Sequence, residues 1–137
     1  MNSYLDVIAP FDGAVLGRVP LSGPAEAEQA LAQAHALFKA RGNWLPASMR
    51  AEIFRRAAQL LSERAEVFAL AAAREGGKPL IDSRVEVARA CDGLLNCAEM
   101  PRSEPGHVVP MDVTPASAGR MAFTQREPIG LLAPTEN

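Results

Sequence analysis

The chain has 137 residues, of which 48% are hydrophobic and 22% charged, with a formal net charge of -2 and a pI of about 5.7. This composition is typical of a globular protein with one domain, and it excludes the basic surface that nucleic acids or anionic membranes require. No apolar run reaches the roughly eighteen residues of a membrane span, and residues 1–6 do not form a secretory signal. We therefore expect a cytoplasmic protein with no nucleic-acid or membrane partner.

The N-terminal part predicts a β-hairpin and then a helix. Residues 5–9 and 14–20 have the pattern of short strands, and Asp12-Gly13 between them is typical of a tight turn. Ser22 is expected to cap the helix, with Pro24 in its first turn. Gly42 is expected to stop this helix. Its predicted apolar face consists of Ala27, Ala30, Leu31, Ala34, Leu37 and Phe38.

Two longer helical patterns follow Trp44, which we expect to anchor neighbouring helices as the only tryptophan. Ser48 is expected to cap the first pattern, and Ser62 to restart or kink the helix. The second pattern is expected to end at Pro101 and then Pro105-Gly106. The predicted buried stripe of the first pattern is Ile53, Phe54, Ala57, Leu60 and Leu61. That of the second is Ile81, Val85, Ala88, Cys91, Leu94, Leu95 and Ala98.

Residues 74–79, Arg-Glu-Gly-Gly-Lys-Pro, separate these two patterns. Adjacent glycines favour the left-handed conformation that closes a helix, and Pro79 keeps Lys78 out of the helical region. A phosphate cradle is the functional alternative, but a P-loop requires Ser or Thr after the lysine and a strand before the glycines. The sequence therefore predicts a hinge between helices.

The C-terminal part predicts strands. Residues 107–111 have an extended pattern, and residues 120–126 alternate as a half-exposed strand does. Residues 129–133 are apolar throughout, as in a strand buried on both faces of a parallel sheet. Such a strand needs neighbours that this sequence does not supply. We therefore expect a chain that stops early or that finds its partners in another polypeptide.

Motifs distributed over residues 5–133 carry a family resemblance. They are, in order, Pro10-Phe11-Asp12-Gly13, Val19-Pro20, Trp44, Arg50-Ala51-Glu52-Ile53, Leu60-Leu61, Glu75-Gly76-Gly77-Lys78-Pro79, Glu86-Val87, the segment Gly106 to Pro110, and Phe123-Thr124-Gln125-Arg126-Glu127-Pro128-Ile129-Gly130. With this order, the chain resembles the N-terminal part of the NAD(P)-dependent aldehyde dehydrogenase superfamily. The E-x-G-K-P and R-E-P-x-G pieces make the resemblance fairly specific.

The resemblance implies an α/β fold with a β-hairpin, three to four helices, a long hairpin arm and the start of a parallel sheet. Residues 1–106 would be the N-terminal helical part of a cofactor-binding domain. Residues 107–127 would be an oligomerisation-type hairpin arm. Residues 128–137 would be the first core strand, truncated.

The resemblance also implies that no catalytic, cofactor-binding or metal-binding residue lies in this chain. Family members oxidise an aldehyde on a cysteine and pass hydride to NAD or NADP, with a glutamate as base, and these groups come later in their sequences. Cys91 and Cys97 lie six residues apart and do not match that nucleophile, so we expect two half-buried or buried thiols without a disulfide or shared metal. Glu75 resembles the family's base only in being a carboxylate, and its position at a predicted helix end fits capping and solvation better. Asn137 follows Gly130 too closely for the family's oxyanion-binding asparagine, and a disordered terminus is expected there.

Two functional hypotheses remain from the sequence. In the first, the chain is part of an aldehyde dehydrogenase, binds no cofactor, is inactive alone, and pairs with copies of itself or with the missing C-terminal part. In the second, it is a stand-alone helical module for interaction or oligomerisation. Self-association is expected through residues 107–133, because unpaired strand edges recruit other chains.

Overall fold

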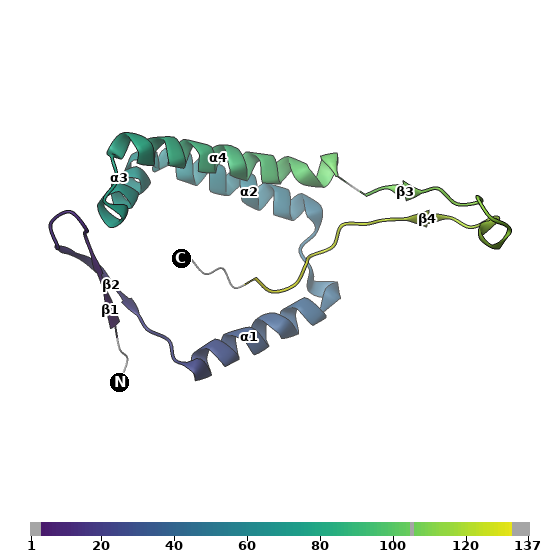
Figure 1. The fold of residues 1–137 in the computed structure, drawn as a ribbon, viewed down its shortest axis with the longest axis horizontal. Coiled ribbons are helices and arrows are strands. Elements are labelled where there is room, and N and C mark those ends of the chain that lie inside the picture. The colour runs from purple at the N-terminus through teal and green to yellow at the C-terminus, as the bar shows by residue number, and fades with distance from the viewer. Residues whose placement is uncertain (1–3, 105, 133–137) are drawn as a thin grey trace.

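A computed structural model of the chain describes residues 4–104 and 106–132, and Figure 1 shows its arrangement. The elements in order are β1 (Tyr4–Ile8), β2 (Val15–Pro20), α1 (Pro24–Lys39), the 3-10 turn η1 (Arg41–Asn43), α2 (Ala47–Glu63), α3 (Ala65–Gly76), α4 (Leu80–Ser103), β3 (Val108–Val109), the 3-10 turn η2 (Pro115–Ser117) and β4 (Ala122–Phe123). Helices and short antiparallel strands together confirm the expected α/β architecture.

The predicted N-terminal hairpin is present. β1 and β2 pair antiparallel, with Leu5 opposite Val19 and a register shift after Val7. Gly13 closes the turn with a φ of 73°, and the Ala14 N–H donates to Asp12 Oδ1 at 3.0 Å, as expected for an Asp-Gly turn.

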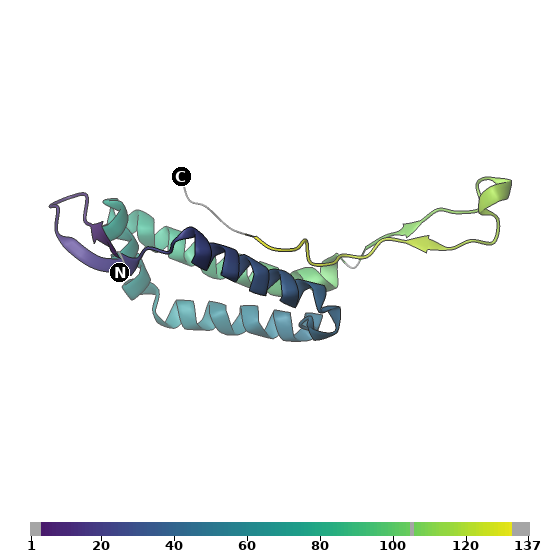
Figure 2. The ribbon, with the colours of Figure 1, turned by 90° about the horizontal axis from the view of Figure 1, so that it is seen from below.

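Helices α2 and α4 lie side by side, and α3 joins them at one end of this layer (Figures 1 and 2). Most of the residues buried among those described lie in these three helices, and all are small or medium-sized: Ala51, Ala58, Ala69, Ser83, Val87 and Ala98. Small side chains allow helix backbones to approach closely, because less volume separates the two axes. The core is therefore a narrow seam between helices.

The predicted buried stripes are largely wrong. On α2, Ile53 and Leu60 are exposed, and on α4 the same holds for Ile81, Val85 and Leu95. No residue of α1 is buried. These helices carry apolar residues on more than one face, and only one face of each meets a neighbour. Periodicity identified amphipathic helices but could not decide which face the neighbour covers.

Helix ends also differ from expectation. Gly23, and not Ser22, is the N-cap of α1, and its N–H donates to Glu26 Oε2 at 2.9 Å. Pro46, and not Ser48, precedes α2. Helix α1 ends at Lys39, ahead of Gly42. The boundary between α2 and α3 falls at Arg64, two residues after Ser62.

Helix α4 extends through Pro101 to Ser103, and so ends between the two sites, Pro101 and Pro105-Gly106, where the sequence predicts its end. A proline near the C-terminal end removes one hydrogen bond, and the remaining bonds of that turn retain the helix. The Glu104 N–H donates to the Met100 carbonyl at 3.1 Å and closes the helix end.

Trp44 lies in the connector between α1 and α2, and its contacts anchor that connector to α1. Its ring stacks on Phe38 with a centroid distance of 5.5 Å, and its Nε1–H donates to the Phe38 carbonyl at 2.9 Å. The indole therefore ties the η1 connector to the last turn of α1.

Residues 107–127, called the arm from here on, project away from the helices (Figure 2). The two predicted strands reduce to β3 and β4, with Val108 opposite Phe123 and Val109 opposite Ala122. Residues 129–132 form no strand, because strand pairing needs a neighbouring chain segment. Ala133 and Asn137 lie outside the described residues.

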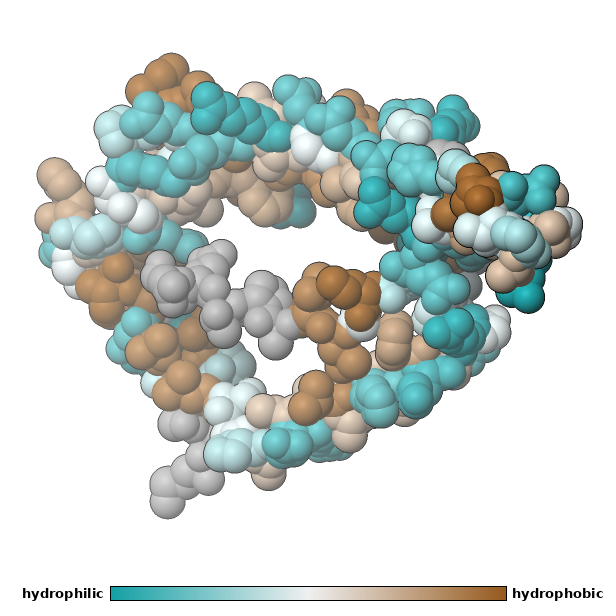
Figure 3. Space-filling view, turned by 45° about the vertical axis from the view of Figure 1, so that its right-hand side comes forward, coloured by the Kyte–Doolittle hydropathy of each residue, from teal (hydrophilic) through white to brown (hydrophobic). Residues whose placement is uncertain are grey.

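The accessible surface is 11291 Å² for a chain of 14.6 kDa. A compact monomer of this mass exposes about 6900 Å². Large apolar side chains account for part of the excess, since Phe11, Ile129 and Met121 are 94%, 86% and 85% exposed. Figure 3 shows apolar residues bordering an opening in the molecule. Much of this apolar surface therefore has no partner among residues 4–104 and 106–132.

Candidate functional site

The hinge packs against the N-terminal hairpin. Gly77 has a φ of 63°, in the left-handed region, and a Cβ built there would lie 2.6 Å from Cγ of Pro10. Lys78 Nζ forms an ion pair with Glu86 on α4. The helix-stop interpretation is therefore confirmed, and Glu75 lies in the last turn of α3.

A cleft of about 530 Å³ lies beside the hinge, between the hairpin and the junction of α3 with α4. Its lining combines apolar side chains with the charged groups of Asp12, Arg74 and Lys78. A dinucleotide pyrophosphate needs free backbone N–H groups at open glycines. Gly77 is instead closed off by Pro10, and Lys78 is neutralised by Glu86. These residues do not fit the pyrophosphate of NAD or NADP.

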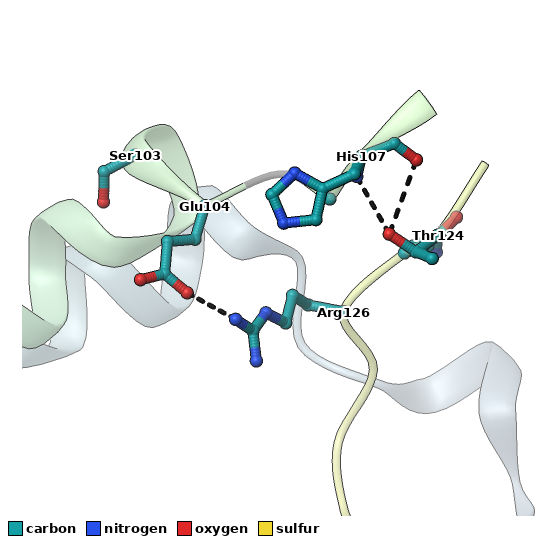
Figure 4. Close-up of a pocket in the computed structure, with 7 residues that line it drawn as sticks. Ser103, Glu104, His107, Thr124 and Arg126 are labelled. Carbon is teal, nitrogen blue, oxygen red and sulfur yellow. Dashed lines mark hydrogen bonds and ion pairs between the residues drawn. The ribbon is translucent and has the colours of Figure 1, made fainter. Parts of the chain in front are cut away.

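A second cleft, of about 550 Å³, lies at the root of the arm (Figure 4). Arg126 Nη2 donates to Glu104 Oε2 at 2.6 Å across it. The His107 N–H donates to Thr124 Oγ1 at 2.9 Å, and the Thr124 N–H donates to the His107 carbonyl at 2.8 Å. Sequence reasoning missed this cleft, because Glu104 and Arg126 are 22 residues apart in the chain, and the R-E-P-x-G motif that contains Arg126 does not include Glu104.

Gly106 explains why the two arm segments meet so closely. Its φ is 120°, and a Cβ there would lie 2.0 Å from the carbonyl oxygen of Thr124. No side chain fits in this space. The sequence signal for this close approach was Gly106 itself, which stands just before the extended pattern of residues 107–111.

The two cysteines are free and half-buried, as predicted. Cys91 and Cys97 lie on α4, and α4 packs against α2 and α3. A reactive thiol requires a group that lowers its pKa, such as a cation or a helix N-terminus. These positions in the middle and later turns of α4 do not provide a helix N-terminus.

Within residues 4–104 and 106–132, no group of three His, Cys, Asp or Glu side chains is placed to hold a metal ion. In the same part of the chain, no helix has the length and apolarity needed to cross a membrane.

Exposed ion pairs connect the helices of the body. The Arg84 guanidinium on α4 donates two hydrogen bonds to Glu66 on α3, at 2.9 and 2.6 Å, and lowers the pKa of that carboxyl. A hydrogen bond from Arg55 on α2, at 2.9 Å, lowers the pKa of Glu99 on α4. These contacts link α2 and α3 to α4 at the surface of the body.

Comparison with known proteins agrees with this picture. Residues 1–134 match the aldehyde dehydrogenase family. An aldehyde-dehydrogenase-like protein of Sinorhizobium fredii is 35% identical over 126 residues, which cover 92% of this chain and 24% of that protein. The 3-sulfolactaldehyde dehydrogenase of Priestia aryabhattai is 43% identical over 84 residues, which cover 61% of this chain and 18% of that protein.

Solved structures give the same result. Aldehyde dehydrogenase 21 of Physcomitrella patens, in complex with the reaction product succinate, superposes with a TM-score of 0.82 at 26% identity, over 90% of this chain and 26% of that one. Glyceraldehyde-3-phosphate dehydrogenase GapN of Methanocaldococcus jannaschii, complexed with NADP, gives a TM-score of 0.74 at 28% identity. The match covers 82% of this chain and 24% of that one. This chain belongs to the aldehyde dehydrogenase family, and the resemblance found in its motifs is confirmed. It spans about a quarter of the length of the relatives it matches.

Proposed function

We propose that this chain is the N-terminal scaffold of an NAD(P)-dependent aldehyde dehydrogenase and oxidises aldehydes only together with residues that it does not itself contain. The observation that carries the proposal is a family match over residues 1–134 that spans about a quarter of the relatives' length. The large exposed apolar surface supports it, since such a surface needs a covering partner.

The division of labour follows from the groups present. In the family, the nicotinamide cofactor accepts the hydride and a cysteine holds the aldehyde carbon. The hinge does not fit the pyrophosphate, and the half-buried thiols of α4 do not resemble the nucleophile. This chain would therefore supply the helical layer, and the remainder of the enzyme would supply nucleophile, base and cofactor contacts. Two free thiols are in keeping with a reducing, cytoplasmic setting.

Within this proposal, residues 1–106 belong to the helical part of a cofactor domain, residues 107–127 form an oligomerisation-type arm, and residues 128–137 begin the first core strand of a sheet. Ile129 and Leu132 are exposed, at 86% and 78%, while Leu131 lies in a shallow cleft against α1. A strand contributed by the rest of the enzyme would pair with this segment and cover it.

Reconstitution tests the proposal. The chain is produced alone and together with the part of the Sinorhizobium fredii relative that it does not match. We expect reduction of NAD or NADP by a panel of short aldehydes in the mixture and none with the chain alone. A chain with Gly93→Ala is the control and should behave as the parent does in the mixture, because a Cβ at Gly93 meets nothing within 4 Å.

Two results would contradict the proposal. One is cofactor reduction by the chain alone that Cys91→Ser or Cys97→Ser abolishes, because the nucleophile would then lie in this chain. The other is a chain that neither restores activity nor binds the remainder of the relative. That second result would favour a stand-alone interaction module, whose binding surface would be the exposed apolar faces.

A further inference from the structure

The arm is attached to the body through two adjacent residues of opposite charge. Arg126 Nη2 binds Glu104 Oε2 at 2.6 Å, just beyond the end of α4 (Figure 4). Glu127 Oε2 lies 3.4 Å from Nη1 of Arg41 in η1. The dipeptide Arg126-Glu127 therefore contacts both the end of α4 and the connector between α1 and α2. It supplies the positive group at the first contact and the negative group at the second.

The Arg41 contact has a fixed support. Its guanidinium carbon lies 5.1 Å from the centroid of the Trp44 ring, and that ring is stacked on Phe38. Stacking on an aromatic face limits the rotamers of an arginine, because the planar guanidinium stays parallel to or over the ring. Glu127 thus meets a cation that is already positioned.

The two arm segments also join at the root. The Thr124 N–H donates to the His107 carbonyl at 2.8 Å, and Gly106 lets the backbones approach. These contacts hold the arm segments to each other but do not attach them to the helical body. The charge pairs do, since Arg126 binds Glu104 at the end of α4 and Glu127 lies against Arg41 in η1.

We propose that Arg126 and Glu127 form a salt-sensitive charge clamp that fixes the direction in which the arm leaves the helical body. The arm beyond the clamp extends away from the helices, so its direction depends on its root (Figure 2). The clamp itself does not depend on the proposed enzyme function. Its consequence for assembly does, since the arm would meet a partner only in the clamped direction.

Exposure makes the clamp sensitive to salt. The Arg126 and Glu104 side chains are 74% and 52% exposed, and those of Arg41 and Glu127 are 69% and 44% exposed. Exposed pairs add little to global stability and weaken as the Debye length shrinks from about 8 Å at physiological salt to about 3 Å at 1 M. Releasing the clamp should therefore free the arm without unfolding the helices.

Spin-label distances test the clamp on the full chain. Nitroxide labels are placed at Ala118→Cys in the arm and Ser62→Cys on α2, in a Cys91→Ser, Cys97→Ser background, and diluted with unlabelled chain so that only distances within one chain count. We expect one narrow distance distribution at low salt. Arg126→Glu, Glu127→Arg, or salt of about 1 M should broaden it about twofold or more.

The charge swap Glu104→Arg with Arg126→Glu should restore the narrow distribution, which a merely damaged arm root would not do. Arg18→Glu is the matched control, because Arg18 forms an exposed 2.7 Å pair with Asp6 inside the N-terminal hairpin. It should leave the distribution unchanged. An equally narrow distribution in the Arg126→Glu and Glu127→Arg chains, or a broad one in the parent chain at low salt, would overturn the clamp. Helical circular dichroism confirms that each variant is folded.

Discussion

Gly77 and Pro10 are in close contact although sixty-six residues separate them in the chain: a Cβ at Gly77 would lie 2.6 Å from Cγ of Pro10. The contact joins the hinge between α3 and α4 to the turn of the N-terminal hairpin. Gly77 is therefore constrained twice, by its left-handed φ of 63° and by its neighbour.

Replacing Gly77 by Val should destabilise the chain by about 1–3 kcal/mol, because a β-branched residue resists a positive φ and Pro10 leaves no room for a side chain. Urea unfolding measures the loss. Gly93→Ala, in the interior of α4, is the matched control and should be stabilising by up to about 1 kcal/mol. An unchanged midpoint for Gly77→Val would show that the hairpin does not rest on the hinge in solution.

Local chemistry explains why the hinge could be predicted while the buried faces could not. Gly77 and Pro79 impose their conformation through their own covalent structure, so neighbours in sequence suffice. Burial of Ala58 in place of Leu60 depends on where α4 lies. The Glu104–Arg126 contact depends likewise on how the chain returns after the arm. Such tertiary contacts leave no pattern at a fixed spacing.

Ser83 provides a second stability test. It is fully buried on α4, and its hydroxyl has no hydrogen-bond partner in the part of the chain that the structure describes. An unsatisfied buried hydroxyl costs about 1–3 kcal/mol, so Ser83→Ala should stabilise the chain by about 1 kcal/mol or more. The exposed Ser62→Ala on α2 is the control, since it gains only helix propensity, up to about 0.5 kcal/mol. A loss of stability for Ser83→Ala would mean that the hydroxyl is bonded in solution.

Stability should decline in acid. Arg84 and Arg55 lower the pKa values of Glu66 and Glu99 below the ordinary 4.5. A carboxyl with a lower pKa in the folded chain stabilises that chain above its unfolded pKa, and this contribution disappears as the pH falls through the folded pKa. We therefore expect the melting temperature to be level above about pH 5 and to fall below about pH 4.5.

The double variant Glu66→Gln, Glu99→Gln identifies the source of that decline. It should melt lower than the parent near neutral pH, and its melting temperature should change less between neutral pH and acid. Because both groups are exposed, the difference should be small and should diminish in salt. The same pH dependence in both chains would assign the acid sensitivity to other groups.

The last prediction concerns self-association through the arm. β3 and β4 pair over only two residue pairs, and their outer edges carry unpaired backbone groups. Val108, Met121 and Phe123 are 79%, 85% and 68% exposed there. Unpaired edges with apolar side chains recruit other chains, while Pro110 and Pro128 limit how far such pairing extends. We therefore expect the full chain to form a dimer or larger assembly in a concentration series followed by light scattering.

Two variants separate the arm from the remaining exposed surface. A chain that ends at Pro105 lacks the arm and should be monomeric. Phe123→Lys should weaken association with little change in melting temperature, because this side chain is already exposed and the new charge opposes edge pairing. If the shortened chain still assembles, the contact lies on the helices, where Ile53 and Leu60 of α2 line an apolar groove. If the full chain stays monomeric, the arm is no assembly element at this length, and its clamp would serve only to position it for the rest of the enzyme.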